Sequence, residues 1–117
     1  MTASITRDEL RDAIAADAAI VVDALPASYY AQAHLPGALN LVADEVAERA
    51  AALLPDRDAA IVTYCSNASC GNSHDVASRL ENLGYSNVRM YRDGIQGWVE
   101  AGLPTESRAD GARSPAA

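Results

Sequence analysis

The chain carries two kinds of hydrophobic pattern, and they alternate along the sequence. Between residues 6 and 16, apolar side chains recur every three or four positions from Leu10 onward, a spacing typical of an amphipathic helix. Thr6 starts this segment with Glu9 three residues later, which is the spacing of a helix-capping box. Short continuous runs rich in Ile and Val are instead typical of strands buried on both faces of a parallel sheet. The pattern therefore predicts helices and strands in alternation.

Two apolar runs predict buried strands, at residues 19–24 and 58–64. Shorter strands are expected at residues 38–41 and 86–91. Helical spacing recurs in four further segments, and glycine or proline follows three of them. The further predicted helices are residues 27–33, 43–53, 73–83 and 94–101. Because crossover helices join parallel strands, this order predicts an α/β fold.

Composition and charge limit the classes of function. The 117 residues suffice for one domain, expected at residues 1–105, and the small, polar residues 106–117 are expected to form a flexible C-terminal tail. A formal net charge of -7 repels phosphate backbones and anionic lipids, so neither nucleic acid nor a membrane is an expected partner. No apolar stretch reaches the ~18 residues of a membrane span, and the first residues lack the pattern of a secretory signal. The sequence favours a cytoplasmic protein.

Cysteine chemistry is expected where the strand at residues 58–64 ends. Cys65 is the first residue after this strand, and ligands of open α/β sheets bind beyond the carboxyl ends of the strands. The loop after Cys65 leads to the N-terminus of a predicted helix, where backbone N–H groups favour an anion. Such donors lower the pKa of a cysteine thiol below its usual ~8.5. Cys65 is therefore a candidate nucleophile.

Four motifs together resemble a single-domain rhodanese. They are VVDA with Asp23, AHLPGA with His34, IVTYC ending at Cys65, and LGYSNVRMYRDGIQGWVEAGLP, and they cover about residues 4–105. The resemblance implies a central parallel sheet of about five strands flanked by helices on both faces. It also implies a sulfurtransferase in which Cys65 takes sulfane sulfur from thiosulfate or a persulfide and passes it to a thiol acceptor. Thioredoxin or another sulfur-relay protein is then an expected partner.

The resemblance further implies that backbone amides from Ser66 to Gly71 hold the persulfide. Short polar side chains in this loop are expected to shape it and to influence the choice of substrate. Ser73 is expected to cap the following helix, with a hydroxyl facing the loop as the alternative. The candidate substrate-binding loop consists of Ser66, Asn67, Ala68, Ser69, Gly71, Asn72 and Ser73.

Two further residues are candidates for supporting roles. Asp23 ends its strand and is expected to bond backbone amides of the next turn, with a place in the active site as the alternative. His34 opens a turn with ready backbone partners, so a structural role is expected, and substrate contact is the alternative. His74 is expected at the surface. No metal or cofactor is expected, because Cys65, Cys70 and His74 lack a fourth ligand and a paired C-x2-C motif.

The loop departs from the usual rhodanese pattern. It is longer and carries no basic side chain, which weakens the binding of a dianion such as thiosulfate and disfavours phosphatase chemistry. Leu25 stands where the family has an arginine. Cys70 creates a C-x4-C pair, and we predict that it resolves a Cys65 persulfide or sulfenate into an intraloop disulfide. The alternative is that Cys70 has no chemical role.

These departures leave other functions open. One alternative is that the domain catalyses no reaction and serves as a sulfur carrier or a protein-interaction module. An arsenate reductase or phosphatase-like enzyme is a further alternative.

Overall fold

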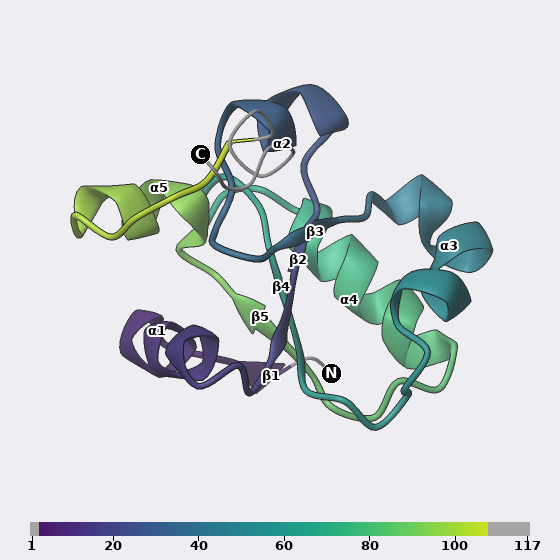
Figure 1. The fold of residues 1–117 in the computed structure, drawn as a ribbon. Coiled ribbons are helices and arrows are strands. Elements are labelled where there is room, and N and C mark those ends of the chain that lie inside the picture. Colours follow the sequence, from purple (N-terminus) through teal and green to yellow (C-terminus); the bar gives the residue numbers. More distant parts are fainter. Residues whose placement is uncertain (1–2, 108–117) are drawn as a thin grey trace.

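Five strands form one sheet in the computed structural model, which describes residues 3–107 (Figure 1). They are β1 (Ala3–Ser4), β2 (Ile20–Asp23), β3 (Leu39–Asn40), β4 (Ile61–Tyr64) and β5 (Val88–Tyr91). Their spatial order is β1-β5-β4-β2-β3, and every neighbouring pair is parallel. The predicted α/β class and parallel sheet are confirmed, and β4 is the central strand.

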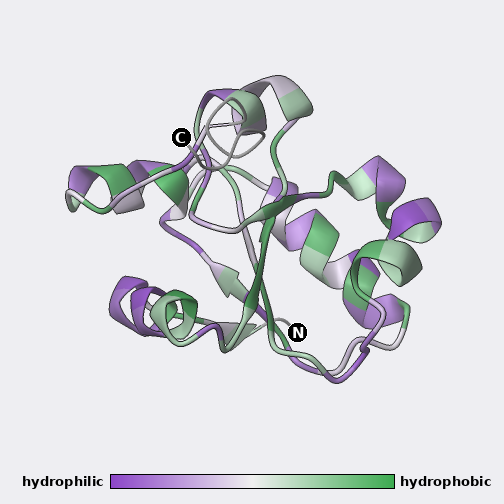
Figure 2. Ribbon diagram, viewed as in Figure 1, coloured by the Kyte–Doolittle hydropathy of each residue, from purple (hydrophilic) through white to green (hydrophobic). Residues whose placement is uncertain are grey.

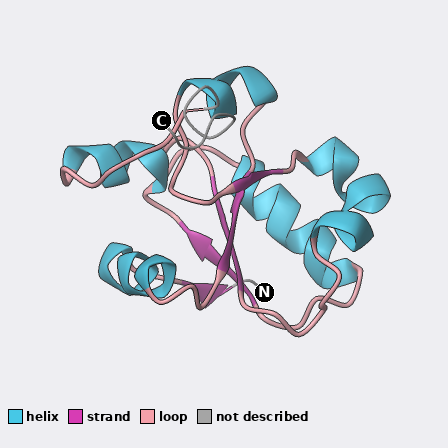
Figure 3. Cartoon of the chain, in the orientation of Figure 1, coloured by secondary structure: helices cyan, strands magenta, loops and turns pink. Residues whose placement is uncertain are grey.

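Helices cover both faces of this sheet, as predicted (Figure 3). They are α1 (Arg7–Ala15), α2 (Ala27–Gln32), the 3-10 helix η1 (Ala43–Glu45), α3 (Val46–Leu53), α4 (Asn72–Asn82) and α5 (Gly94–Glu100). In Figure 1, α1 and α5 lie on one side of the strands, and α3 and α4 lie on the other. The capping box of α1 is confirmed: Thr6 Oγ1 accepts from Glu9 N at 3.2 Å, and Glu9 Oε1 accepts from Thr6 N at 3.0 Å.

The sheet separates two hydrophobic cores. Successive side chains of a strand point to opposite faces, so β4 contributes to both cores. Ile61 packs with α3 and α4, whereas Val62 and Tyr64 pack with α1 and α5. Hydrophobic segments, green in Figure 2, run along the strands and along the inner sides of the helices. Cys65 continues the alternation and belongs to the core on the side of α3 and α4.

The structure differs from the predicted elements at both ends. The edge strand β1 was not predicted, because a strand of 2 residues is too short to carry a hydrophobic period. Glu106, the first residue of the predicted tail, forms an antiparallel bridge with His34. The ordered domain therefore extends at least to Glu106, and the rest of the predicted tail from residue 108 lies outside the described residues. Among residues 3–107, no helix combines the length and apolar character that a bilayer crossing requires.

Candidate active site

The central strand leads directly into the candidate nucleophile. β4 pairs with β2 on one side and β5 on the other, so Cys65 lies at the carboxyl edge in the middle of the sheet. The Cys65 side chain is 1% exposed. Its Sγ atom lies 3.4 Å from Ser73 Oγ and 3.4 Å from the carbonyl oxygen of Cys70. The sulfur therefore occupies the expected edge of the sheet, but it is buried beneath the loop.

Ser73 faces this sulfur and does not cap the helix. Gly71 occupies the N-cap position of α4 without a side-chain hydrogen bond, so the expectation that Ser73 caps α4 is wrong. Ser73 instead lies buried in the first turn, and its carbonyl accepts from Thr63 Oγ1 at 3.0 Å. Asn72 precedes it and lines a different cavity, shared with η1, so the start of α4 is split between two environments.

The two cysteines are joined by a disulfide across the loop. The Cα atoms of Cys65 and Cys70 lie 6.4 Å apart, within the ~4.4–6.8 Å that disulfides span. The loop is thus curled enough for the two cysteines of the C-x4-C pair to meet.

Cys70 is the more accessible of the two cysteines. Its side chain is half-buried, and it lines a cavity of about 230 Å³ between the loop, α4 and the end of β5. Arg92 and His74 line the same cavity and are exposed. His74 is a surface residue, as expected, but it lies beside a cysteine.

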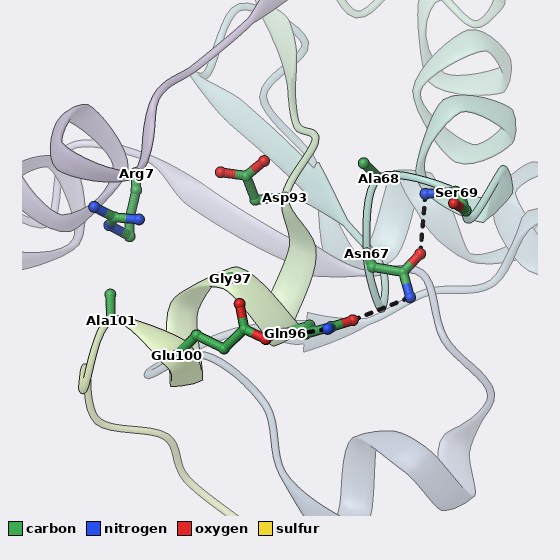
Figure 4. Close-up of a pocket in the computed structure, with 9 residues that line it drawn as sticks. All are labelled: Arg7, Asn67, Ala68, Ser69, Asp93, Gln96, Gly97, Glu100 and Ala101. Carbon is green, nitrogen blue, oxygen red and sulfur yellow. Dashed lines mark hydrogen bonds between the residues drawn. The ribbon is translucent and has the colours of Figure 1, made fainter.

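Asn67 shapes the loop through three hydrogen bonds. Its carbonyl accepts from Cys70 N at 3.1 Å, and its Oδ1 accepts from Ser69 N at 2.9 Å. Its Nδ2 donates to Gln96 Oε1 at 3.2 Å, and Figure 4 shows the bonds to Ser69 and Gln96. The first two bonds form a turn that places Cys70 over Cys65. The third attaches the loop to α5.

The N-terminus of α5 also holds the loop backbone. Ile95 N donates to Cys65 O at 2.9 Å, and Gln96 N donates to Ser66 O at 2.9 Å. Gly94 makes this approach possible, since a Cβ there would lie 2.5 Å from Cys65 O, and its φ of +69° also favours glycine. The sequence did not predict that these residues hold the loop. Gly94, the first glycine of DGIQGW, is the sequence signal that points to this contact.

A second cavity, of about 770 Å³, opens on the outer side of the loop. Figure 4 shows Arg7 from α1 and Asp93 from the β5–α5 turn on one side, and Ala68 and Ser69 of the loop on the other. The loop carries no basic residue of its own, but Arg7 and Arg92 approach it from other elements. Sequence reasoning missed both arginines, because only the folded chain brings them to the loop.

Asp23 belongs to a buried network on the face opposite Cys65. Its Oδ1 accepts from Leu25 N at 2.8 Å, and its Oδ2 accepts from the Tyr64 hydroxyl at 2.8 Å. That hydroxyl in turn accepts from Leu35 N at 3.0 Å. Burial raises the pKa of Asp23, although the hydrogen bonds from Leu25 and Tyr64 act in the opposite direction. Asp23 therefore bonds the turn that follows its strand, as expected, and its bonds do not lead to the loop.

His34 has a structural position near the same end of the sheet. Its Nδ1 lies 2.7 Å from Tyr30 O, and its ring stacks on the Tyr30 ring with centroids 3.8 Å apart. Its backbone pairs with Glu106 through two hydrogen bonds of 2.8 Å. These contacts agree with the expected structural role and hold the turn that follows α2.

With this geometry established, comparison with known proteins decides the family. A family model described as "Rhodanese-like domain" matches residues 6–101. The chain belongs to the rhodanese-like domain family. The crystal structure of the BH2092 protein from Bacillus halodurans is similar to this rhodanese-like domain, with a TM-score of 0.83, 24% sequence identity, and coverage of 92% of this chain and 78% of that one. This likeness supports the shared fold.

Two curated relatives differ in what they are named for. The HTH-type transcriptional regulator Rv0324 of Mycobacterium tuberculosis is 38% identical over 106 residues, which are 91% of this chain and 46% of the regulator. The thiosulfate sulfurtransferase GlpE of Actinobacillus succinogenes is 28% identical over 103 residues, covering 88% of this chain and 89% of GlpE. The rhodanese-like domain described here thus spans less than half of the first relative and most of the second.

Proposed function

We propose that this rhodanese-like domain transfers sulfane sulfur to a thiol acceptor through a persulfide on Cys65. One observation carries the proposal: Cys65 is the residue at the carboxyl end of the central strand, and its loop leads to the N-terminus of α4. This is the edge at which α/β sheets bind ligands, and the helix N-terminus favours a sulfur anion. Ser73 Oγ lies 3.4 Å from the sulfur, so in the reduced protein its hydroxyl is placed to donate to a Cys65 thiolate.

The proposed reaction has two displacements. The Cys65 thiolate attacks the outer sulfur of thiosulfate or of a persulfide, and sulfite or a thiolate leaves with the electron pair of the broken S–S bond. The acceptor thiolate then attacks the outer sulfur of the Cys65 persulfide, and Cys65 leaves as a thiolate. Because Cys65 is bonded to Cys70 in the structure, the active form is the reduced one.

Turnover by reduced protein tests this proposal. The reduced wild type is expected to release sulfite from thiosulfate, or the sulfinate from methanethiosulfonate, and Cys65→Ser is expected to release neither. Thiosulfate carries two negative charges and methanethiosulfonate carries one. Comparing their rates therefore also shows whether Arg7 and Arg92 bind the more highly charged donor in place of a basic residue in the loop. Equal rates for the wild type and Cys65→Ser with both donors would contradict the proposal.

A sensor without turnover is the second candidate, and one observation favours it. The relative with 38% identity is named as a transcriptional regulator, and the chain matches 46% of its length. In this alternative, the Cys65–Cys70 pair changes oxidation state without passing sulfur on. Stoichiometric modification of Cys65 with no catalytic turnover for any donor would support the sensor and oppose the enzyme.

A further inference from the structure

Building on the proposed sulfur transfer, on which this inference rests, we propose that Cys70 makes the domain release sulfide. Cys70 displaces hydrosulfide from the Cys65 persulfide, and a small anionic thiol then reduces the disulfide from the cavity beside Arg92. The thiol that cleaves the persulfide is thus inside the loop, and the external thiol serves as the reductant.

The fold brings the two cysteine sulfurs together. The Cα atoms of Cys65 and Cys70 lie 6.4 Å apart, and the two sulfur atoms are bonded. The turn at Asn67 holds Cys70 in this place through the hydrogen bond from Cys70 N to Asn67 O, 3.1 Å long. In a persulfide, the Cys65 Sγ atom is the inner sulfur. The loop therefore directs Cys70 at the inner sulfur, and attack there yields the disulfide seen in the structure.

The first step balances without an added oxidant. The Cys70 thiolate donates an electron pair to Cys65 Sγ, a new S–S bond forms between the cysteines, and the bond to the outer sulfur breaks. The outer sulfur of the protonated persulfide leaves with that electron pair and keeps its proton, as hydrosulfide, HS⁻. The sulfane sulfur is reduced to sulfide, and the two cysteines are oxidised to the disulfide.

The disulfide is open to attack from one side. Cys65 is 1% exposed, whereas Cys70 lines the cavity of about 230 Å³. This volume is below the ~300–1,000 Å³ typical of drug-sized ligand sites and suits a small thiol. The six lining residues are Ala68, Cys70, Ser73, His74, Met90 and Arg92. An incoming thiolate therefore reaches Cys70 Sγ, and Cys65 is the leaving thiolate.

The charge of this cavity favours an anionic reductant. Arg92 carries a fixed positive charge, and none of the described residues that line the cavity is Asp or Glu. The imidazole of His74 adds a polar group to the lining of the cavity. In a chain of net charge -7, such a local basic site attracts a carboxylate-bearing thiol more strongly than a neutral one.

The second step also balances. The first thiolate forms a mixed disulfide with Cys70 and releases the Cys65 thiolate. A second thiolate attacks the sulfur of the bound thiol, so the Cys70 thiolate leaves and the oxidised thiol dimer departs. Two thiols thus supply the two electrons that the sulfane sulfur gained.

Single-turnover loading tests the role of Cys70. Reduced protein, freed of thiols and kept without oxygen, is mixed with thiosulfate, and sulfite, sulfide and intact mass are measured. The wild type is expected to release one equivalent each of sulfite and sulfide and to lose the mass of two hydrogens. Cys70→Ser is expected to release sulfite only and to keep the mass of one added sulfur atom, with Cys70→Ala as a second variant of the same kind.

The outcomes separate the two proposals. Sulfite release with an added sulfur that persists on the wild type would overturn the role of Cys70 and leave Cys65 transfer standing. Failure of the wild type to load sulfur from either thiosulfate or methanethiosulfonate would overturn both. The wild-type mass alone decides between these results, so the test does not depend on the folding of a variant.

Reduction kinetics test the cavity. The rate constant for reduction of the oxidised protein is measured with 3-mercaptopropionate, which is anionic, and with 2-mercaptoethanol, which is neutral. Arg92→Gln is expected to slow reduction by 3-mercaptopropionate about fivefold, the size of a single close charge interaction in water, and to leave 2-mercaptoethanol unaffected. Arg79→Gln removes the same charge from the last turn of α4 and is the matched control.

Two results would overturn the assignment of the cavity. One is an equal effect of Arg92→Gln on both thiols, and the other is an equal effect of Arg92→Gln and Arg79→Gln on 3-mercaptopropionate. Salt gives an independent readout, because screening is expected to remove the preference for the anionic thiol in the wild type.

Discussion

Asp23 is a buried carboxyl group whose hydrogen bonds come from neutral donors. The family arginine two residues later is Leu25 in this chain, and Asp23 instead accepts from the Leu25 amide and the Tyr64 hydroxyl. Burial raises the pKa of Asp23 above the ordinary value of 3.8. The ionised form is thus less favourable in the folded state than in the unfolded chain, and stability depends on pH through this residue.

The pH dependence of stability is expected to reveal Asp23. Below pH 3.8 both states hold the proton, and as pH rises the unfolded chain releases it first. The contribution of Asp23 to the stability of the wild type therefore decreases from about pH 4 upward until the folded state also ionises. The free energy of unfolding of Asp23→Asn minus that of the wild type is expected to increase between about pH 3 and pH 7. Urea denaturation at a series of pH values measures this difference.

In this difference, the contributions of the other carboxyl groups to the free energy of unfolding cancel, because both proteins contain them. If the two free energies of unfolding differ by the same amount at every pH, Asp23 has the same pKa in the folded and unfolded states. A difference that decreases with pH would show a lowered pKa and would contradict the dominance of burial.

The Tyr64 hydroxyl links two buried groups and is expected to matter for stability. Tyr64→Phe removes the donor to Asp23 and the acceptor for Leu35 N. The loss is expected to be about 1–3 kcal/mol in the free energy of unfolding, because buried polar groups are left without partners. Tyr29→Phe is the control, since Tyr29 is 56% exposed. Equal midpoints for the two variants in urea denaturation would refute the importance of this network.

At the scale of elements, local patterns predicted most of the fold. The capping box at Thr6 and the apolar spacing that follows it placed α1, and the runs at residues 19–24 and 58–64 placed β2 and β4. These features depend on neighbours in the sequence. The edge strand β1 depends on pairing with β5, far along the chain, so its own residues carried no pattern that predicts it.

The candidate site also combines features that local sequence patterns predict with features that depend on contacts between distant segments. The place of Cys65 follows from the strand before it and the helix after it, and both are local patterns. The positions of Arg92, Arg7 and Gly94 at the loop follow from the packing of β5, α1 and α5, which sequence spacing does not encode. The burial of Cys65 likewise depends on the way the loop folds over it.

The contact between α5 and the loop is expected to be essential for the site. Gly94→Ala introduces a Cβ 2.5 Å from Cys65 O, so the loop or α5 must move. The proposed sulfur transfer by Cys65 is expected to fall at least tenfold, because Cys65 Sγ then loses its alignment with Ser73 Oγ, which lies 3.4 Å away. Steady-state sulfite release by the reduced protein measures this effect.

Gly102→Ala is the matched control for this variant. Gly102 has a φ of +79°, similar to Gly94, but a Cβ there would meet nothing within 4 Å. It therefore reports the cost of the backbone conformation alone, about 1 kcal/mol in stability, without disturbing the loop. Equal activity of the two variants would mean that the close approach of Gly94 to Cys65 has no role in transfer.

At the scale of the whole molecule, the segment after α5 returns to the turn that follows α2. Trp98 Nε1 donates to Pro104 O at 2.7 Å, and Glu106 pairs with His34 through its backbone. The Glu106 carboxylate also accepts from Gly37 N at 3.0 Å. These bonds connect α5 to the turn after α2, and they show why residue 106 belongs to the domain.

Truncation is expected to show this connection. A chain that ends at Thr105 lacks the pairing of Glu106 with His34, whereas a chain that ends at Ser107 keeps it. The shorter chain is expected to be less stable by about 1–3 kcal/mol, the size of a few lost hydrogen bonds. Thermal unfolding of the two truncated chains measures the difference. Identical midpoints would indicate that the bridge contributes nothing to stability.

The alternation of side chains along β4 has a consequence for how this domain can diversify. Tyr64 packs on one face of the sheet, while Cys65, its immediate neighbour and the proposed nucleophile, packs on the other. Substitutions in the loop can accordingly change donor or reductant preference without loosening the Tyr64–Asp23 anchor. Libraries that vary residues 66–70 should therefore contain a high fraction of folded variants. Because Tyr64 and Cys65 lie on opposite faces of the sheet, specificity can also evolve without loss of the fold.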